Sequence, residues 1–303
     1  MKILILGSDG FVGKNLLEDL SAGFNCFGST RRPERLSAEK KLLHFDLEAE
    51  STWANVKDFN PDCIINCIVS GAVKKVEDVK HALDTNYLHT INFFDFLSKQ
   101  LPDVYLIHLG TAFEYNLRKG GLTENTECRP RTYYGISKLL TSHYLLNSGI
   151  LKKNTIIRPF NLFGPYDKEE KIIPHLICAQ RDKKPISLTE GLQVRDYFFV
   201  KDLSRIALHL LKEGFHKPAV VNAGSGKPVI LKDAASIIAK YLPDYDASLW
   251  HWGKLPYREG EGKVFYNAST LLKERGLVFT ELEQAIKATV AYYCGVKQTQ
   301  NVW

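Results

Sequence analysis

Two side chains spaced four residues apart, Tyr134 and Lys138, have the chemistry of a proton-transfer pair. On a helix, residues at this spacing lie one turn apart on the same face. An ammonium group beside a phenol stabilises the phenolate, so we expect the pKa of Tyr134 to fall from about 10 toward neutrality. Such a phenol can exchange a proton with an alcohol or a ketone. Because the same spacing occurs on ordinary helix surfaces, the pair predicts a site only together with a second signal.

The second signal is a glycine-rich turn at the start of the chain. Residues 2–6 (KILIL) indicate a strand buried on both faces of a parallel sheet, and residues 14–20 have helical periodicity. The glycines between them permit a tight turn, close approach of a pyrophosphate and close packing of helix on strand. The free N–H groups of a helix N-terminus favour phosphate. We assign to this dinucleotide site Gly7, Asp9, Gly10, Phe11, Val12 and Gly13.

Together with later segments, these motifs resemble the extended short-chain dehydrogenase/reductase family, especially its nucleotide-sugar-modifying branch. The later segments are residues 158–165, 195–202, 222–226 and 257–261, which occur in the family's order. The resemblance covers nearly the whole chain. It implies an α/β fold, a Rossmann-type doubly wound parallel sheet with a smaller mixed C-terminal substrate lobe. The cofactor domain is expected at 1–163 with about 194–222, and the substrate lobe at 164–193 and 223–303.

Alternating strands and helices support the same fold. Strands are expected near residues 24–28, 42–45, 63–68, 104–108 and 154–157, and right-handed crossovers through the helices between them make the sheet parallel. Long apolar helices are expected near 75–98 and 132–148. They could simply pack against the sheet, but the family uses the corresponding pair to dimerise through a four-helix bundle. A homodimer is therefore expected.

The end of the second strand distinguishes NAD from NADP. An NAD site places a carboxylate there for the ribose 2′-hydroxyl, whereas residues 29–32 read STRR and the next acid is Glu34. Hydroxyl and guanidinium groups can hold a 2′-phosphate. NADP(H) is therefore predicted, although the arginines could instead be solvated loop charges. The residues assigned to the phosphate are Thr30, Arg31 and Arg32. The resemblance adds Asp46 and Leu47 for the adenine and Lys138 for the nicotinamide ribose.

The loop after the strand near 104–108 narrows the reaction. In the family, a Ser or Thr four residues before a tyrosine positions the substrate oxygen, which selects Thr111, four residues before Tyr115. The family's 4,6-dehydratases carry acids one or two positions after that residue, and its 3,5-epimerase-reductases carry a cysteine two positions after it. This chain has Ala112 and Phe113 there, so both reactions are disfavoured. Glu114 is expected to point away from the site on an extended segment and to be structural.

Simple redox chemistry at a ketone remains. The chain is predicted to be an NADPH-dependent reductase of a nucleotide-linked 4-keto-6-deoxyhexose, with Tyr134 as the acid, Lys138 beside it and Thr111 holding the carbonyl. Residues 255–261 are similar to reductases of dideoxysugar pathways, including synthases of CDP-linked 3,6-dideoxyhexoses. The candidates for binding the substrate's diphosphate are Asn161, Arg195 and Arg258.

Three alternatives stay open. An NAD-dependent nucleotide-sugar C4-epimerase would use the same three catalytic residues, keep its NAD bound and return the hydride to the other face of the sugar. A dehydrogenase of the same branch would oxidise the alcohol instead. A cofactor-sensing regulator would bind NADP without chemistry, but such proteins commonly lose the Tyr/Lys pair, which this chain keeps.

Composition is consistent with an enzyme of this kind. With 303 residues, 45% of them apolar, the chain can bury a large core. No signal peptide or membrane-spanning stretch is evident. The six cysteines form no zinc-like pairs, so no metal is predicted and a reducing, cytoplasmic compartment is expected. A formal charge of +6 suits anionic ligands, and the lack of a basic block argues against nucleic acid.

Overall fold

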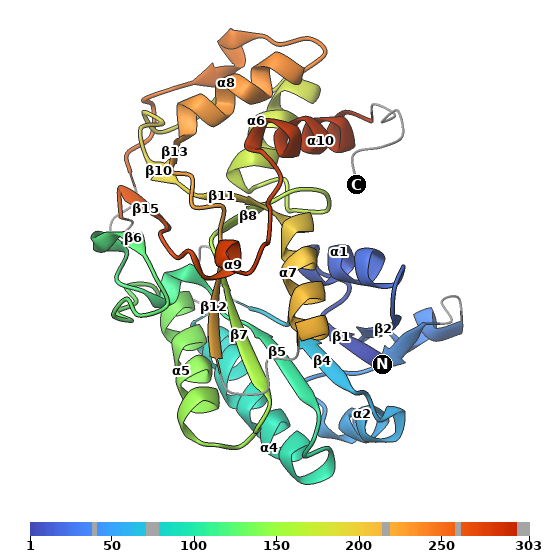
Figure 1. Ribbon diagram of the computed structural model, residues 1–303. Helices are drawn as coiled ribbons and strands as arrows, with labels where there is room; N and C mark the ends of the chain where they lie inside the picture. The colour runs from blue at the N-terminus through green and yellow to red at the C-terminus, as the bar shows by residue number, and fades with distance from the viewer. Residues whose placement is uncertain (38–40, 71–78, 214–218, 258–261, 296–303) are drawn as a thin grey trace. The chain divides into compact units, whose positions relative to one another are not determined.

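The computed structural model describes residues 1–37, 41–70, 79–213, 219–257 and 262–295 (Figure 1). These residues form two compact units. The first comprises the described residues of Met1–Asn116, Glu124–Pro159 and Leu203–Ala223. The second comprises Leu117–Thr123, Phe160–Asp202 and the described residues from Gly224 onward.

A parallel seven-stranded sheet forms the centre of the first unit, in the order β12-β7-β5-β4-β1-β2-β3. Its strands are β1 (Lys2–Leu6), β2 (Asn25–Thr30), β3 (Leu42–His44), β4 (Cys63–Asn66), β5 (Tyr105–Leu109), β7 (Asn154–Pro159) and β12 (Ala219–Ala223). The strand order reverses beside β1, where β2 lies on one side and β4 on the other, and such a switch point is where doubly wound sheets bind ligands. The predicted Rossmann-type sheet and its strands are confirmed.

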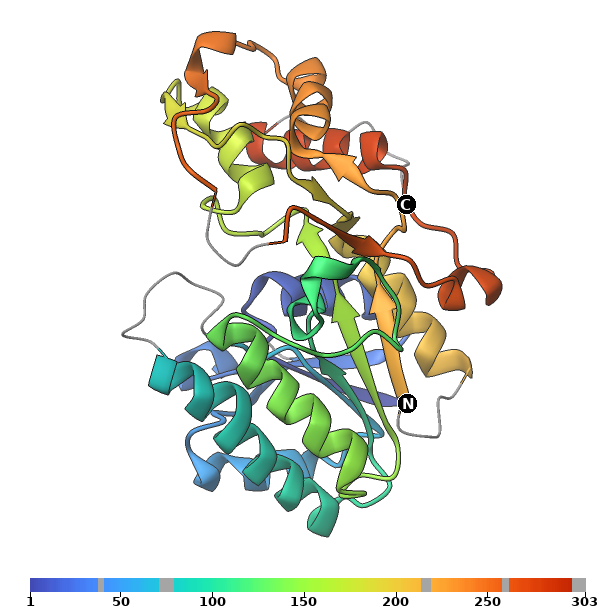
Figure 2. The same ribbon diagram turned by 90° about the vertical axis from the view of Figure 1, so that its left-hand side faces the viewer.

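Helices cover both faces of this sheet (Figure 1). They are α1 (Phe11–Leu20), α2 (Trp53–Phe59), α3 (Val79–Leu83), α4 (Thr90–Gln100), α5 (Tyr133–Asn147) and α7 (Val200–Glu213), which begins in the second unit. A π-helix, Asp84–His89, joins α3 to α4. The helices predicted near 75–98 and 132–148 are present, except that residues 75–78 lie outside the described residues. Figure 2 shows α4 and α5 side by side against the sheet.

The core on one face of the sheet explains why these helices pack there. Alternate residues of the central strands, including Leu4 and Ile64, meet aromatic side chains of α2 and α4. The rings of Trp53 and Phe93 lie 5.4 Å apart edge to face, an arrangement that aromatic quadrupoles favour. A strand that is buried on both faces of the sheet has a continuous apolar sequence, as residues 2–6 do.

Smaller sheets make up the second unit. A four-stranded mixed sheet has the order β13-β10-β15-β6, with β10 antiparallel to β13 and parallel to β15. Two further pairs are β8 with β11 and β9 with β14. The strands are β6 (Gly120–Leu122), β8 (Asn161–Phe163), β9 (Ile186–Ser187), β10 (Val194–Arg195), β11 (Tyr197–Phe199), β13 (Val229–Ile230), β14 (Trp250–His251) and β15 (Val264–Asn267). This is the predicted smaller mixed sheet.

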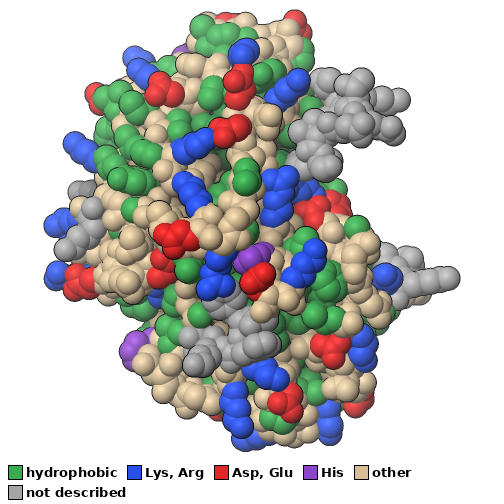
Figure 3. Space-filling model, viewed as in Figure 1, with side chains coloured by type: hydrophobic (Ala, Val, Ile, Leu, Met, Phe, Trp, Pro, Cys, Tyr) green, Lys and Arg blue, Asp and Glu red, His purple; other side chains and the backbone are tan. Residues whose placement is uncertain are grey.

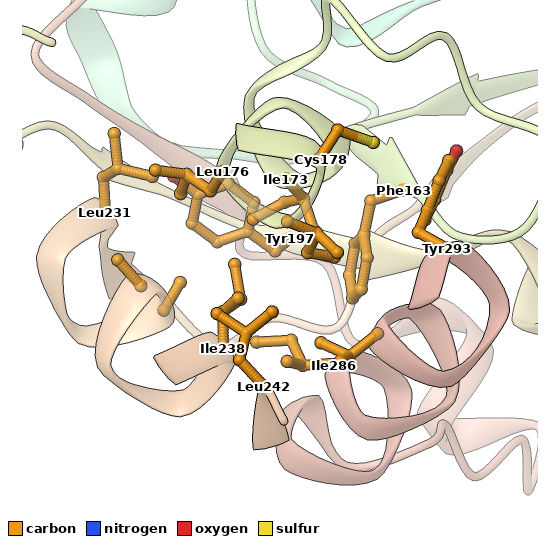
Figure 4. Packing of buried hydrophobic residues seen from close by; sticks show 14 of the residues in the cluster. Phe163, Ile173, Leu176, Cys178, Tyr197, Leu231, Ile238, Leu242, Ile286 and Tyr293 are labelled. Carbon is orange, nitrogen blue, oxygen red and sulfur yellow. The ribbon is translucent and has the colours of Figure 1, made fainter. Parts of the chain in front are cut away.

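The core of the second unit lies among α6 (Ile172–Arg181), α8 (Leu231–Tyr241) and α10 (Leu282–Cys294); the short helix α9 (Leu271–Glu274) completes its helices among the described residues. Figure 4 shows Leu176, Ile238 and Ile286 directed toward one another from the three helices. Phe163 of β8 and Tyr197 of β11 close this core from the strands. The unit therefore has its own apolar centre, distinct from that of the seven-stranded sheet.

The units differ from the predicted domain boundaries at residues 117–123, 160–163 and 194–202, which group with the second unit. The reason is strand pairing, since β6 pairs with β15, β8 with β11, and β10 with β13 and β15. On the face shown in Figure 3, basic and acidic side chains are interspersed. Among the described residues, the structure contains no helix long and apolar enough to cross a membrane.

Candidate active site

The glycine-rich turn between β1 and α1 has the geometry that a pyrophosphate requires. Gly7 has φ +75°, a conformation that glycine adopts without strain, and its carbonyl accepts a hydrogen bond from Gly10 N at 3.0 Å. A Cβ on Gly13 would lie 2.3 Å from Gly7 O, so only glycine lets α1 approach the strand this closely. The N-terminal N–H groups of α1 lack partners within the helix and can donate to phosphate. The turn that contains the predicted residues 7–13 therefore fits a dinucleotide.

Asp9 connects this turn to the end of β2. Its carboxylate accepts hydrogen bonds from Thr30 Oγ1 at 3.2 Å, from Arg32 Nη2 at 3.4 Å and from Arg35 Nη1. Burial raises the pKa of Asp9, but the hydrogen bonds from Arg35, Arg32 and Thr30 together with the charge of Arg35 outweigh burial and lower it. The hydroxyl and guanidinium groups predicted for a 2′-phosphate thus already surround one anion, while Arg31 is exposed. Arg35 was missed; its spacing from Arg32, one turn of the 3₁₀-helix Pro33–Ser37, is the signal that could have found it.

Asp46 and Leu47 follow β3. Asp46 Oδ1 accepts a hydrogen bond from Glu48 N at 3.1 Å, and Asp46 N donates to Thr52 Oγ1 at 2.9 Å, so this turn is held by its own side chains. The side chain of Leu47 is buried in the core beside Phe45. Contact of this pair with an adenine stays a prediction.

Thr111 and Tyr134 come together at the carboxyl end of β5. Thr111 caps the 3₁₀-helix Ala112–Glu114, and its hydroxyl is hydrogen-bonded to Tyr134 in the first turn of α5. The rings of Phe113 and Tyr134 meet edge to face at 6.3 Å. A Cβ on Gly135 would lie 2.4 Å from Phe113 O, so this glycine is what lets α5 begin directly against the loop. The predicted substrate-positioning hydroxyl and the predicted acid therefore face one another.

Glu114 holds the loop that carries Thr111 in place. Its fully buried carboxylate accepts a hydrogen bond from Thr111 N at 2.9 Å and one from Arg158 Nε at 2.8 Å, and Arg158 Nη2 forms an ion pair with it at 2.8 Å. The guanidinium of Arg158 in turn lies over the ring of Tyr115, 4.5 Å from its centroid. Glu114 is structural, as expected, but it lies on a 3₁₀ turn rather than an extended segment. Arg158, within a segment that carried the family resemblance, was missed as the partner that holds this loop.

Lys138, one helical turn after Tyr134, is buried, and its Nζ lies 3.3 Å from His108 Nε2. Burial lowers the pKa of Lys138 to about 8. Burial also raises the pKa of Tyr134 to about 12, against the lowering effect of the Thr111 hydrogen bond. The expectation that the pKa of Tyr134 falls toward neutrality is therefore wrong in this structure. The reason is that burial penalises both charged forms and Nζ is directed to a histidine.

The π-helix Asp84–His89 supplies a residue that sequence reasoning did not find. Asn86 Nδ2 donates to Ser70 O at 2.7 Å and to Ser137 Oγ at 3.0 Å, and Asn86 Oδ1 accepts from Ser70 N at 2.8 Å. Because Ser137 precedes Lys138, these bonds fix α5 where it carries the pair. Single-turn π-helices are frequent at functional sites, but no residue type in a sequence predicts a π-helix.

Asn161 and Arg195, which were predicted to bind the substrate's diphosphate, belong to the second unit. Asn161 Nδ2 donates to Asp196 O at 3.4 Å. Arg195 is buried with its guanidinium 4.5 Å from the Phe265 ring centroid, and Nη1 donates to the carbonyls of Val194 and Lys263 at 2.9 and 3.0 Å. Those contacts hold the mixed sheet together, and a diphosphate role for either residue stays a prediction. Arg258 lies outside the described residues.

Comparisons with known proteins agree with this arrangement. The model of the "NAD dependent epimerase/dehydratase family" matches residues 3–224. CDP-abequose synthase of Salmonella muenchen is 24% identical over 268 residues, 86% of each chain. GDP-6-deoxy-D-talose 4-dehydrogenase of Aggregatibacter actinomycetemcomitans is 28% identical over 222 residues, 70% of this chain and 71% of that one. The fold matches that of Thermus thermophilus UDP-glucose 4-epimerase in complex with NAD, with TM-score 0.83 and 21% identity over 98% of this chain and 100% of that one.

Proposed function

Because the chain belongs to the NAD dependent epimerase/dehydratase family, we propose that it is an NADP(H)-dependent reductase of a nucleotide-linked 4-keto-6-deoxyhexose. The name of the 6-deoxytalose 4-dehydrogenase describes redox chemistry at carbon 4 of a nucleotide-linked 6-deoxyhexose. The similarity to a CDP-abequose synthase agrees with the resemblance of residues 255–261 to dideoxysugar enzymes. The nucleotide and the sugar are left to experiment.

The loop at residues 111–114 is the observation that carries the proposal. Thr111 is hydrogen-bonded to Tyr134, which gives one hydroxyl to hold a carbonyl oxygen and one phenol to protonate it. Ala112 and Phe113 carry no group that moves a proton, and Glu114 is committed to Arg158 and to Thr111 N. Tyr134 of α5 is therefore the single proton-transfer group among these residues. That is enough for reduction of a ketone, whereas dehydration or 3,5-epimerisation needs another acid or base.

In the proposed reaction, Tyr134 acts as the acid. When bound, a nicotinamide cofactor would supply a hydride for the carbonyl carbon. The carbonyl π-electrons move to oxygen, and Tyr134 gives its proton to that oxygen while Thr111 Oγ1 holds it by a hydrogen bond. With a pKa of about 12, the phenol carries its proton at neutral pH, so the site starts in the form that donates. The resting protonation state of Tyr134 is therefore the one that reduction of a ketone needs.

The cofactor would be held by four sets of residues in the first unit. The turn of residues 7–13 would bind the pyrophosphate, and Asp46 and Leu47 the adenine. Thr30, Arg31 and Arg32, with Arg35 added from the structure, would bind the 2′-phosphate. The carboxylate of Asp9 shows that this group can surround an anion, since three of its members donate to it. Lys138 would bind the nicotinamide ribose.

We propose that Asn161, Arg195 and Arg258 bind the diphosphate of the substrate. The guanidinium groups suit phosphate because their N–H donors match two oxygens at once. The six cysteines are free, and we infer from them a reducing compartment, the cytoplasm. The interspersed charges seen on one face (Figure 3) support a small anionic ligand over nucleic acid.

We also propose a homodimer formed through α5. Three large apolar side chains at helical spacing on this helix, Tyr133, Ile136 and Leu140, are 56%, 38% and 40% exposed, and Leu88 of the adjoining π-helix is 47% exposed. A monomer rarely leaves such a row in water. The occupant proposed is a second copy, because a row on one helix packs on its own two-fold image without a further partner.

The test is NADPH consumption, followed by absorbance, with 4-keto-6-deoxyhexoses carried on CDP, dTDP, GDP and UDP, and with NADH in parallel. We expect rapid oxidation of NADPH with one carrier and slow oxidation of NADH. Tyr134→Phe should lose at least a hundredfold in turnover and still bind NADPH, because it removes the proton but not the ring. Unchanged turnover in Tyr134→Phe contradicts the mechanism.

A C4-epimerase is the second candidate, favoured by two observations. The solved structure with TM-score 0.83 is an epimerase in complex with NAD, and Asp9 places a carboxylate beside Thr30, where an NAD site can use one. This candidate predicts that the purified protein retains NAD and interconverts two sugars without net cofactor turnover. A regulator that binds NADP without chemistry is disfavoured by the intact Thr111–Tyr134 hydrogen bond.

A further inference from the structure

The carboxylate of Asp9 lies at the carboxyl end of β2, where a doubly wound sheet receives the adenosine ribose of a dinucleotide. Thr30 is the last residue of that strand, and its hydroxyl donates to Asp9 Oδ2 at 3.2 Å. Arg32 Nη2 donates to the same oxygen at 3.4 Å, and Arg35 Nη1 donates to Oδ1. One anion of the chain itself therefore already engages donors that were assigned to a 2′-phosphate.

The place of Asp9 is fixed by hydrogen bonds of its neighbours. Ser8 Oγ donates to Ser29 O at 2.9 Å, and Gly7 N donates to Ser29 Oγ at 3.0 Å. Both serines are 4% exposed, so these bonds are shielded from water. They join the two residues before Asp9 to the residue before Thr30. The backbone of Asp9 is thereby held beside the end of β2.

The hydroxyl of Thr30 has one hydrogen to donate. Arg32 N donates to Thr30 Oγ1 at 3.2 Å, and a backbone N–H can only donate. The hydroxyl hydrogen is therefore directed to Asp9 Oδ2. A phosphate group at neutral pH presents strong acceptor oxygens, so it needs the same hydrogen. A 2′-phosphate and Asp9 therefore compete for the Thr30 hydroxyl.

The two anions also compete for positive charge. Burial raises the pKa of Asp9, but its hydrogen bonds and the charge of Arg35 lower it below the ordinary value, so the carboxylate is ionised at neutral pH. Its charge offsets one of the two positive charges of Arg32 and Arg35. A 2′-phosphate, with a charge of about −1.5 to −2, is repelled by it. A ribose 2′-hydroxyl, in contrast, can donate a hydrogen bond to a carboxylate.

We propose that Asp9 is a specificity-determining residue, an internal anion that competes with the 2′-phosphate of NADP(H) for the Thr30 hydroxyl and the two guanidinium groups. Asp9 thereby narrows the preference for NADP(H) over NAD(H) below what these donors alone would give. The inference rests on the proposed function in one respect, namely that a 2′-phosphate binds at the end of β2. It is independent of the sugar and of the reaction, because it concerns the cofactor site alone.

The experiment is titration calorimetry of the cofactor-free protein with adenosine 2′,5′-bisphosphate and with adenosine 5′-monophosphate, which differ only in the 2′-phosphate. Asp9→Asn keeps the shape of the side chain and an oxygen that accepts hydrogen bonds, but removes the charge. We expect it to raise the ratio of the two binding constants about tenfold or more, through tighter binding of the bisphosphate.

Glu34→Gln is the matched control. It removes an equal charge from the 3₁₀-helix Pro33–Ser37, where Glu34 is exposed. We expect it to change the ratio by less than about twofold, because water and salt screen exposed charges. Circular dichroism of each variant confirms that it folds.

A ratio in Asp9→Asn that equals the wild-type ratio, or lies below it, overturns the proposal. A residue that merely orients the arginines would weaken the bisphosphate when replaced, and a distorted glycine-rich turn would weaken both ligands equally. The outcome for the cofactor is read separately. A preference for the bisphosphate that appears only in Asp9→Asn supports this inference and refutes NADP(H) as the cofactor of the wild type. No preference in either protein refutes both.

Discussion

Replacing Arg158 with Met is expected to destabilise the protein strongly and to loosen the catalytic loop. The side chains of Arg158 and Glu114 are 4% and 0% exposed, and the carboxylate has two 2.8 Å contacts with the guanidinium, one a hydrogen bond from Nε and one an ion pair with Nη2. Met fills similar space over Tyr115 but leaves the carboxylate with the hydrogen bond from Thr111 N and without its guanidinium partner. Breaking a buried pair from one side costs about 3–5 kcal/mol, because the other charge stays behind.

For a chain of this size, roughly 2 °C of melting temperature corresponds to 1 kcal/mol. Arg158→Met should therefore melt roughly 6–10 °C below the wild type. Because Glu114 also holds Thr111 N, we expect turnover to fall by about tenfold while NADPH binding changes little, since the cofactor turn is elsewhere in the unit. Thermal unfolding followed by circular dichroism, with NADPH oxidation kinetics, measures both effects.

Two controls make the result interpretable. The double variant Glu114→Gln with Arg158→Met removes both charges, and Gln can still accept from Thr111 N, so we expect it to regain most of the lost stability. Lys153→Met breaks the exposed pair with Asp103, whose atoms are 3.7 Å apart, and should shift melting by less than about 2 °C. A melting point for Arg158→Met within 2 °C of the wild type, or a double variant as unstable as the single one, would refute the reasoning.

Three further changes test other parts of the molecule. Arg35→Ala should raise the KM for NADPH about tenfold and leave that for NADH unchanged, and equal effects on both cofactors would contradict a 2′-phosphate site. Burial raises the pKa of Asp167 to about 7, against about 3.9 in an unfolded chain. Its contribution to stability is thus fully present below pH 4 and lost as the pH rises through 7. Asp167→Asn should therefore gain roughly 2–4 kcal/mol at pH 8 and nothing at pH 4, and a gain independent of pH in denaturant titrations would count against this. Leu140→Glu should convert a dimer to a monomer in sedimentation experiments. Lys152→Glu is the surface control and should stay dimeric. A monomeric wild type would contradict the dimer proposal.

The parts of the molecule that the sequence predicted are those determined by local pattern. Six strands and the turn of residues 7–13 follow from apolar runs and glycine spacing, because a strand buried on both faces has few other solutions. The meeting of Thr111 and Tyr134 was also predictable, since both lie at the carboxyl edge of a parallel sheet, one after β5 and one at the start of the next helix.

The parts that it did not predict depend on distances across the fold. Arg158 and Glu114 are 44 residues apart and meet only because β5 and β7 are neighbours. The direction of the pKa shift at Tyr134 depends on burial outweighing nearby charge, which spacing along a helix does not reveal. A π-helix between α3 and α4 likewise has no residue signature.

The protonation state of Tyr134 separates the proposed reductase from its two catalytic alternatives. A dehydrogenase needs the phenolate as a base, and an epimerase needs it in the first half of its cycle. With a pKa of about 12, forming the phenolate at pH 7 costs roughly 7 kcal/mol, at 1.36 kcal/mol per unit. A reductase starts from the phenol and forms the phenolate only as the proton passes to the substrate oxygen, so the phenol is the form that must be populated before turnover. This argument is independent of the residues at the end of β2, so it applies equally if the enzyme uses NADH.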